Sequence, residues 1–251
     1  MHDLLDKNII VTGASSGLGR GTSIVLSQLG ARLCLIGRNE AELEKTLELM
    51  EGKNHLVCPL DLCDFARYRE TFAYMVTQLG LLHGLVHFAG IRKTLPLKIM
   101  KLEQLREMFE INFFSFLELV KFFSLKSSVD AAGGSIVAIS SVAALRGISG
   151  LVGYSSSKAA LDSAVRSLTC ELANRHIRVN SIAPGYVETP MNVETKKTLS
   201  DAAYAEIIKK HPLGIGEPKD VAHLTAFLLS DKAKWITGNT IPIDGGFAIR
   251  S

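Results

Sequence analysis

Tyr154 and Lys158 are the residues whose types and spacing most clearly suggest chemistry, with Ser141 thirteen positions upstream. A tyrosine and a lysine four residues apart on a helix lie on the same face. A phenol titrates near pH ~10, and a neighbouring ammonium favours the phenolate and lowers that pKa. The pair is therefore suited to moving a proton on or off an alcohol oxygen. The same spacing also occurs by chance on amphipathic helices, so the rest of the chain must decide between the two interpretations.

A glycine-rich turn near the N-terminus suggests a phosphate site. Residues 8–12 have the pattern of a short buried strand, Gly13-Ala14-Ser15-Ser16-Gly17-Leu18-Gly19 follows it, and a helical pattern covers 17–29. A helix N-terminus preceded by glycines attracts a phosphate, because free N–H groups point at the anion and no Cβ blocks its approach. Glycines also simply close βα corners, and this spacing is looser than the ordinary dinucleotide fingerprint.

This glycine spacing, together with Ser141, Tyr154 and Lys158, resembles that of the short-chain dehydrogenase/reductase family. The resemblance spans essentially the whole chain. Further matching segments follow in the family's order: Glu110-Ile111-Asn112, Ile139-Ser140-Ser141, Pro184-Gly185 and Ile241-Pro242-Ile243-Asp244-Gly245-Gly246. The last segment resembles the C-terminal signature of the branch that includes 3-oxoacyl-[acyl-carrier-protein] reductases.

The resemblance implies a set of site residues. The catalytic residues would be Asn112, Ser141, Tyr154 and Lys158. The cofactor-binding residues would be Gly13, Ser15, Ser16, Gly17, Leu18, Gly19, Arg38, Asp61, Leu62, Ala89, Gly90, Tyr154, Lys158, Pro184, Gly185, Val187 and Thr189. Asp61 would bind the adenine amino group, and Thr189 would contact the nicotinamide carboxamide. Asp61 also suits a helix N-cap, although Asp64 is better placed for that role. No metal site is expected.

Arg38 predicts which nicotinamide cofactor is used. It directly follows the strand predicted over 31–37, beside the expected adenosine site. An acidic residue there would bind a ribose 2′-hydroxyl, whereas an arginine can pair with a 2′-phosphate. No Asp or Glu lies in this strand, so the sequence predicts NADP(H) in preference to NAD(H). An ordinary surface arginine is the alternative interpretation.

Alternation of strands and helices predicts an α/β fold: a Rossmann-like, doubly wound, seven-stranded parallel sheet with helices on both faces. With no linker or repeat, we expect one dinucleotide-binding oxidoreductase domain over 1–251, with a substrate lid around 186–214. Ligands bind beyond the carboxyl ends of such strands. Strands are predicted near 8–12, 31–37, 55–59, 83–89, 134–140, 177–183 and 239–243, and helices near 17–29, 39–51, 64–79, 101–128, 152–174 and 217–230.

Composition argues against several other classes of protein. Lys plus Arg minus Asp plus Glu is 28 − 25 = +3, so no nucleic-acid surface is expected. No apolar run approaches ~18–20 residues, so no membrane span is expected, and the early first strand leaves no room for a signal peptide. The four cysteines lack metal-like spacing and are interpreted as small core residues of a cytoplasmic protein: Cys34, Cys58, Cys63 and Cys170.

The chain departs from the family where the fourth strand ends. The family usually has Asn-Asn-Ala-Gly there, and this chain has His87-Phe88-Ala89-Gly90. We expect His87 to be a packed or hydrogen-bonded core histidine and not a catalytic base, and Phe88 to be a core residue. The replaced asparagines brace the sheet in the family, so the change is expected to affect local stability or pocket shape.

By resemblance, the activity would be hydride transfer between NADP(H) and a carbonyl or secondary alcohol, most similar to 3-oxoacyl thioester reduction. The substrate would be a small molecule, with a carrier-protein or CoA thioester as one form, and the protein a homotetramer. Two alternatives stay open: a dehydrogenase of sugars, polyols or other small alcohols, and a non-catalytic NADPH-binding sensor. Arg92, Lys93 and Arg146 either attract an anionic substrate or are solvated surface charges.

Overall fold

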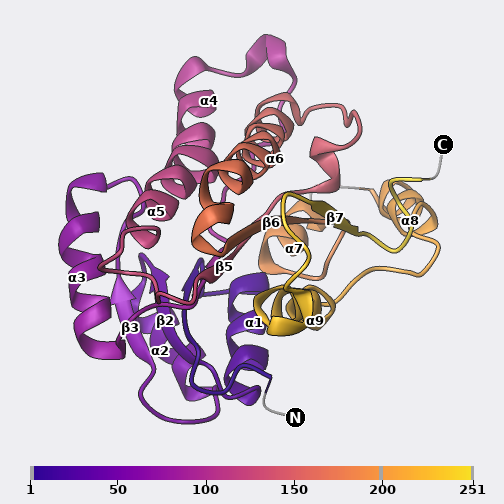
Figure 1. Ribbon diagram of the computed structural model, residues 1–251. Helices are drawn as coiled ribbons and strands as arrows, with labels where there is room; N and C mark the ends of the chain where they lie inside the picture. The colour runs from indigo at the N-terminus through magenta and orange to yellow at the C-terminus, as the bar shows by residue number, and fades with distance from the viewer. Residues whose placement is uncertain (1–2, 198–199, 250–251) are drawn as a thin grey trace.

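The chain alternates strands and helices over residues 3–197 and 200–249, which are the residues that the computed structural model describes (Figure 1). Three parts of the predicted 1–251 domain lie outside this range: residues 1–2, residues 250–251, and residues 198–199 of the predicted lid. The strands are β1 (Asn8–Thr12), β2 (Arg32–Gly37), β3 (Leu56–Pro59), β4 (Gly84–His87), β5 (Gly134–Ile139), β6 (Ile177–Pro184) and β7 (Thr240–Ile243). The helices are α1 (Gly17–Gln28), α2 (Glu40–Glu48), α3 (Tyr68–Leu79), α4 (Leu102–Phe109), α5 (Ser115–Phe123), α6 (Val152–Leu172), α7 (Pro190–Lys197), α8 (Asp201–Lys209) and α9 (Pro218–Leu229).

Within the described residues, seven strands form one parallel sheet in the order β3-β2-β1-β4-β5-β6-β7. The strand order reverses between β1 and β4, and at such a reversal a crevice opens beyond the carboxyl ends of the strands. Every strand in the middle of the sheet is buried on both faces, which explains their continuous apolar runs. The predicted fold class is confirmed.

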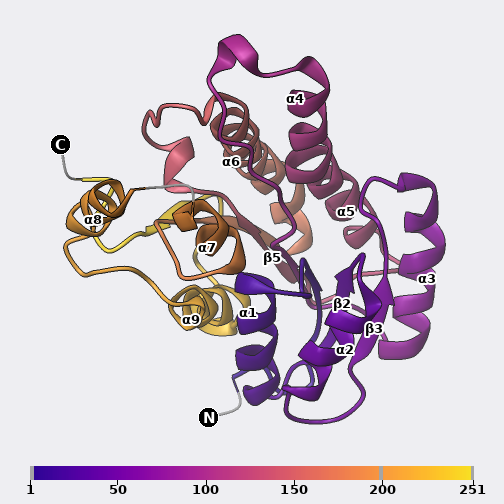
Figure 2. The same ribbon diagram turned by 180° about the vertical axis from the view of Figure 1, so that it is seen from behind.

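Helices cover both faces of the sheet, as Figures 1 and 2 show from opposite sides. On one face, α3, α5 and α6 bury an apolar core that includes Phe72, Phe116 and Val165. On the other face, α1, α2 and α9 bury a second core. Both layers are needed, because a parallel sheet exposes apolar side chains on each side.

The helix predicted over 101–128 is interrupted. The structure has α4, then a π-helical turn over Glu110–Phe114, then α5. Such a wide turn inserts one extra residue and redirects the side chains within it, and it is frequent at functional sites. Here it holds Asn112, so the interruption belongs to the candidate site.

The predicted lid contains two helices, α7 and α8. Ser200 begins α8, because its hydroxyl accepts a hydrogen bond from the Ala203 amide at 3.2 Å. Pro190 begins α7, and a proline is tolerated at that first position because its missing N–H would have no partner there.

Two predictions about single residues are wrong, those for Cys63 and Cys170. Cys34 and Cys58 are buried as expected, but Cys63 and Cys170 are exposed. Cys63 follows the end of β3 in a surface turn, where its amide donates to Asp61 Oδ1 at 3.0 Å. Asp64 begins the short helical turn Phe65–Arg67 without a side-chain capping bond.

Within residues 3–197 and 200–249, no helix has both the length and the apolar character that crossing a membrane requires.

A buried carboxylate fixes α6 to the sheet. Asp162 Oδ2 accepts a hydrogen bond from Ser140 Oγ at 2.7 Å, and its Oδ1 accepts one from Ser181 Oγ at 2.7 Å. Ser140 follows β5 and Ser181 lies in β6, so one side chain connects a helix with two strands. The Ser140 hydroxyl is thus engaged with Asp162, whereas the neighbouring Ser141 hydroxyl is not.

An Asp162→Asn substitution is therefore expected to lower the free energy of unfolding by about 2 kcal/mol, because an amide cannot accept both charge-assisted bonds. Urea unfolding followed by circular dichroism measures this change. Asp64→Asn is the matched control, since Asp64 is exposed and its side chain caps no helix. Equal stability of the two variants would contradict the anchoring role of Asp162.

Candidate active site

A cavity of about 320 Å³ lies over the carboxyl ends of β1 to β4, where the strand order reverses. Twelve of the predicted cofactor-binding residues line it: Gly13, Ser15, Ser16, Gly17, Leu18, Gly19, Arg38, Asp61, Leu62, Ala89, Gly90 and Thr189. Most residues that the sequence predicts to bind the cofactor therefore line a single cavity. Tyr154, Lys158, Pro184, Gly185 and Val187, also predicted to bind the cofactor, line an adjoining cavity.

The glycine-rich turn has the shape that a pyrophosphate requires. Gly13 and Gly17 have φ angles of +65° and +53°, which side chains other than glycine rarely adopt. A Cβ on Gly19 would lie 2.2 Å from the Gly13 carbonyl oxygen, so only glycine lets the first turn of α1 approach the loop this closely. The start of α1 then faces the cavity with backbone N–H groups, which suits a dinucleotide phosphate.

A smaller cavity of about 100 Å³ continues from the first, sharing Leu18, Phe88, Gly90, Thr189 and Met191 with it. Its inner wall holds Ser141, Tyr154 and Lys158, which come from the end of β5 and from α6. The structure thus brings three of the four predicted catalytic residues, Ser141, Tyr154 and Lys158, to the end of the first cavity. Phe88, predicted to be a core residue, is only half-buried and lines both cavities while packing against the core.

Lys158 is buried and held by the backbone. Its ammonium donates a hydrogen bond to the Ile139 carbonyl at 2.6 Å, next to the segment that carries Ser141. Burial lowers the pKa of Lys158 to about 8, and the nearby Asp162 carboxylate acts in the opposite direction. The ammonium therefore loses its charge within a few units of neutral pH unless a ligand supplies further negative charge.

Tyr154 differs from the expectation. Burial raises the pKa of its phenol above the ordinary value, while the charge of Arg92 and hydrogen bonding with Ser141 act in the opposite direction. The Lys158 ammonium lies 6.0 Å from the centre of the Tyr154 ring and is committed to Ile139, so the predicted lowering of the phenol pKa by Lys158 is not found. Tyr154 is consequently a protonated phenol at neutral pH, which is the form that can donate a proton.

Ser141 lies two residues beyond the end of β5, has an extended conformation and begins the short helical turn Val142–Ala144. Its hydroxyl oxygen accepts a hydrogen bond from the Ala143 amide at 3.2 Å, which orients the oxygen toward the turn. The same hydroxyl hydrogen-bonds with Tyr154, which brings the two hydroxyl groups together in the cavity.

Asn112 is buried in the π-helical turn. Its Oδ1 accepts a bond from the Ile91 amide at 2.8 Å, and its Nδ2 donates to the Ile91 carbonyl at 3.0 Å and to Ser157 Oγ at 2.9 Å. A Cβ on Gly90 would lie 3.1 Å from Asn112 Oδ1 and 3.4 Å from Lys158 Nζ. Asn112 therefore fixes the loop after β4 against α6, beside Lys158.

His87 lies in the segment that differs from the family pattern, and it braces the end of β4 against β1. Its Nδ1 lies 3.1 Å from Thr12 Oγ1, which also accepts a bond from the Ala89 amide at 3.2 Å. Burial lowers the pKa of His87 to about 3, with the charge of Lys158 as a second cause, so the ring is neutral. The expectation of a hydrogen-bonded core histidine agrees with this geometry.

A third cavity, of about 440 Å³, opens from Ser141 and Tyr154 toward the lid. Apolar side chains line one part of it, namely Val142, Ala143, Ile148, Leu151, Ile207 and Phe247, and polar side chains line the rest, among them Thr94, Ser149, Tyr186, Asn192, Lys210 and His211. Arg92 and Arg146 also line it, whereas Lys93 instead forms an ion pair with Glu107 outside it. The sequence hypothesis about substrate-attracting cations therefore applies to two of the three residues.

The sequence did not reveal the part that the C-terminal segment plays in this cavity. Phe247 stacks on the His211 ring at 4.7 Å between centroids, and the Arg146 guanidinium lies 4.9 Å from the centre of the Phe247 ring. Arg146 Nη1 also donates to the Phe247 carbonyl at 2.7 Å. Asp244 orders this segment by accepting bonds from the Gly246 and Ala248 amides. No local pattern signals such a contact, because it joins residues about 100 positions apart.

Comparison with known proteins places the chain in a family. A family model described as enoyl-(acyl carrier protein) reductase matches residues 13–248. The chain is 33% identical over 249 residues to 3-oxoacyl-[acyl-carrier-protein] reductase FabG of Thermotoga maritima, covering 97% of this chain and 98% of that protein. It is 32% identical over 249 residues to L-xylulose reductase of Caenorhabditis elegans, covering 98% of each.

A solved short-chain type dehydrogenase/reductase from Mycobacterium ulcerans superposes with a TM-score of 0.91 at 30% identity, covering 98% of this chain and 91% of that one. The extent of these matches, together with the fold, identifies the chain as an oxidoreductase. The protein belongs to the short-chain dehydrogenase/reductase family.

Proposed function

We propose that this protein transfers a hydride between NADP(H) and a carbonyl or secondary alcohol, and that it acts as a 3-oxoacyl thioester reductase. The observation that carries the proposal is the position of Ser141 and Tyr154. Both line the small cavity that continues the cofactor cavity and also the apolar cavity beneath the lid. A carbonyl group between these cavities would have its carbon toward the cofactor and its oxygen toward the two hydroxyls.

The proposed roles follow from the protonation states and hydrogen bonds. Tyr154, a protonated phenol, donates its proton to the carbonyl oxygen, and Ser141 donates a hydrogen bond that orients the same oxygen. Lys158 holds the nicotinamide ribose, and Asn112 keeps the loop after β4 in register with Lys158 and supports a water-linked proton relay. When bound, the nicotinamide supplies the hydride to the carbonyl carbon.

The cofactor assignment rests on Arg38, which lines the adenosine end of the first cavity beside Ser15 and Ser16. A guanidinium there suits a 2′-phosphate better than a 2′-hydroxyl. In the same cavity, Asp61 would bind the adenine amino group and Thr189 the nicotinamide carboxamide. The neighbouring Pro184, Gly185 and Val187 would pack against the nicotinamide ring.

The apolar walls of the third cavity favour an acyl substrate. The Thermotoga maritima relative bears the name of a 3-oxoacyl-[acyl-carrier-protein] reductase, which agrees with this choice. The L-xylulose reductase relative favours the alternative of a sugar or polyol dehydrogenase. Ile148, Leu151, Ile207 and Phe247 supply no hydrogen-bond partners from their side chains, which favours an acyl chain along that part of the cavity. Polar side chains that could bind hydroxyl groups also line the cavity, among them Thr94, Ser149, Asn192 and His211, so the panel of substrates below includes sugars. A non-catalytic NADPH sensor would not need Tyr154.

The wider setting of the enzyme is also a proposal. We propose that residues 186–214 close over the substrate, that the protein works as a cytoplasmic homotetramer, and that the substrate is a CoA or carrier-protein thioester. Exposed apolar side chains on and beside α4 and α6, such as Leu102, Phe114 and Val152, support association through these helices.

Consumption of NADPH and of NADH by acetoacetyl-CoA, a 2-enoyl thioester, keto-sugars and small ketones tests the proposal, with loss of absorbance at the nicotinamide band as the readout. We expect turnover of acetoacetyl-CoA with NADPH, and at least about tenfold lower kcat/KM with NADH, as befits one lost charge-assisted contact. Turnover confined to sugars or small ketones would move the enzyme to the alternative class. Reduction of the enoyl thioester alone would contradict the carbonyl chemistry.

The pH dependence of kcat/KM follows from Lys158 and Tyr154. Lys158 loses its proton as the pH rises through about 8, whereas Tyr154 keeps its proton to higher pH. Carbonyl reduction should therefore fall by about tenfold per pH unit above this pKa. In Asp162→Asn the descending limb should move to lower pH, because the Asp162 charge raises the pKa of Lys158. A level profile to pH 10 would contradict the role of Lys158.

A further inference from the structure

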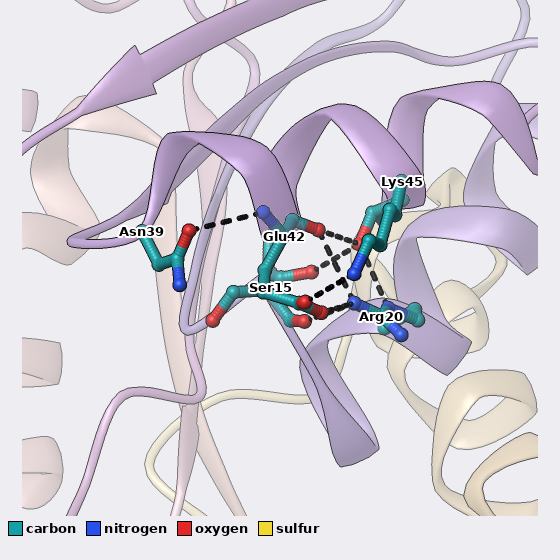
Figure 3. Close-up of polar contacts among 7 residues, drawn as sticks. Ser15, Arg20, Asn39, Glu42 and Lys45 are labelled. Atoms are coloured by element: carbon teal, nitrogen blue, oxygen red, sulfur yellow. Dashed lines mark hydrogen bonds and ion pairs between the residues drawn. The ribbon is translucent and has the colours of Figure 1, made fainter.

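Arg20, in the first turn of α1, holds together two segments that flank the adenosine end of the cofactor cavity (Figure 3). Its Nε donates to Thr46 Oγ1 at 2.9 Å. The two N–H bonds of its Nη2 are shared among three acceptors: the Glu42 carbonyl at 3.2 Å, Glu42 Oε2 at 2.7 Å, and the Ser15 carbonyl. One guanidinium therefore joins the glycine-rich turn to α2.

The two segments joined by Arg20 carry the groups that face the cavity. Ser15 and Ser16 line it from the glycine-rich turn, and Arg38 lines it from the end of β2. Asn39 follows Arg38 and begins α2, because its side chain accepts a bond from the Glu42 amide at 3.2 Å. The position of Glu42 thus fixes the start of α2, and with it the backbone that directly follows Arg38.

Further contacts show that the segments are closely fitted. Thr46 Oγ1, besides accepting from Arg20, lies 2.8 Å from the Ala14 carbonyl. A Cβ on Gly37 would lie 3.5 Å from Ser15 Oγ. A small displacement of α2 would therefore change the separation between the Ser15 hydroxyl and the Arg38 side chain.

The strength of the ion pair alone does not explain this arrangement. The side chains of Arg20 and Glu42 are 27% and 36% exposed, and a pair so open to solvent adds little stability. Its geometry is more informative: a planar guanidinium reaches acceptors on both segments at once, which a lysine ammonium cannot reproduce in the same positions.

We propose that Arg20 is a positioning residue for cofactor selection. It sets the distance between the glycine-rich turn and Arg38, so that a 2′-phosphate on the adenosine ribose contacts both. This inference rests on the proposed use of NADP(H). Arg20 itself does not line the cavity, and it acts through the backbone of Ser15 and through α2.

Titration of protein fluorescence with NADPH and with NADH tests the inference in four variants of the full chain. Arg20→Lys keeps the charge but loses the fork, and we expect its Kd for NADPH to rise by about tenfold, the equivalent of one charge-assisted hydrogen bond, with less than about a twofold change for NADH. Thr46→Val should shift the ratio of the two constants in the same direction. Lys45→Met is the matched control, because it removes the other partner of Glu42 and leaves the Arg20 contacts intact.

Arg38→Ala separates the inference from the proposed function. A loss of NADPH affinity in Arg38→Ala, with an unchanged NADPH-to-NADH ratio in Arg20→Lys, would overturn the positioning role and keep the cofactor assignment. An unchanged ratio in both variants would overturn both. An equal loss of affinity for NADPH and for NADH in Arg20→Lys would overturn selective positioning, because it would show a general effect on the folding of the turn. Thermal unfolding without cofactor measures such an effect independently.

Discussion

The hydrogen bonds that the Asp162 carboxylate accepts from Ser140 and Ser181 determine the position of the candidate site. They fix α6 to β6 and to the residue that follows β5, and α6 carries Tyr154 and Lys158. Ser140 is also the immediate neighbour of Ser141. A shift of α6 along the sheet would therefore break the bonds to Asp162 and, at the same time, move Tyr154 away from Ser141. The same contacts thus stabilise this face of the fold and hold the site in its geometry.

Burial of the same helix determines the protonation states of the site. Tyr154 is stabilised as a neutral phenol, and the pKa of Lys158 falls to about 8. The protein without a bound cofactor therefore does not lower the pKa of Tyr154, and the proposed chemistry does not require it to. In the carbonyl-reducing direction a neutral phenol is the required form, and the negative charges of a bound cofactor would favour the charged form of Lys158.

Much of the fold and of the candidate site could be predicted from the sequence, because parallel strands bring their carboxyl ends to one edge. Gly13, Asp61, Gly90 and Ser141 each follow a strand, so one crevice collects them. The π-helical turn around Asn112, the stacking of Phe247 on His211 and the Arg20 contacts could not be predicted. These features depend on tertiary contacts. In particular, the spacing of apolar residues over 101–128 predicts a helix whether or not that helix contains a π-helical turn. The direction of the Tyr154 pKa shift depends on burial, which residue spacing does not reveal.

The central claim is that Tyr154 supplies the proton during hydride transfer. Tyr154→Phe tests it most directly, because the ring that packs against the site is kept and only the hydroxyl is removed. Single-turnover reduction of acetoacetyl-CoA, measured beside NADPH binding, should show a loss of at least about 10²-fold in rate, the usual contribution of a general acid, with the Kd for NADPH within about twofold of the unaltered protein. Turnover at the rate of the unaltered protein, with NADPH bound equally well, would contradict the account.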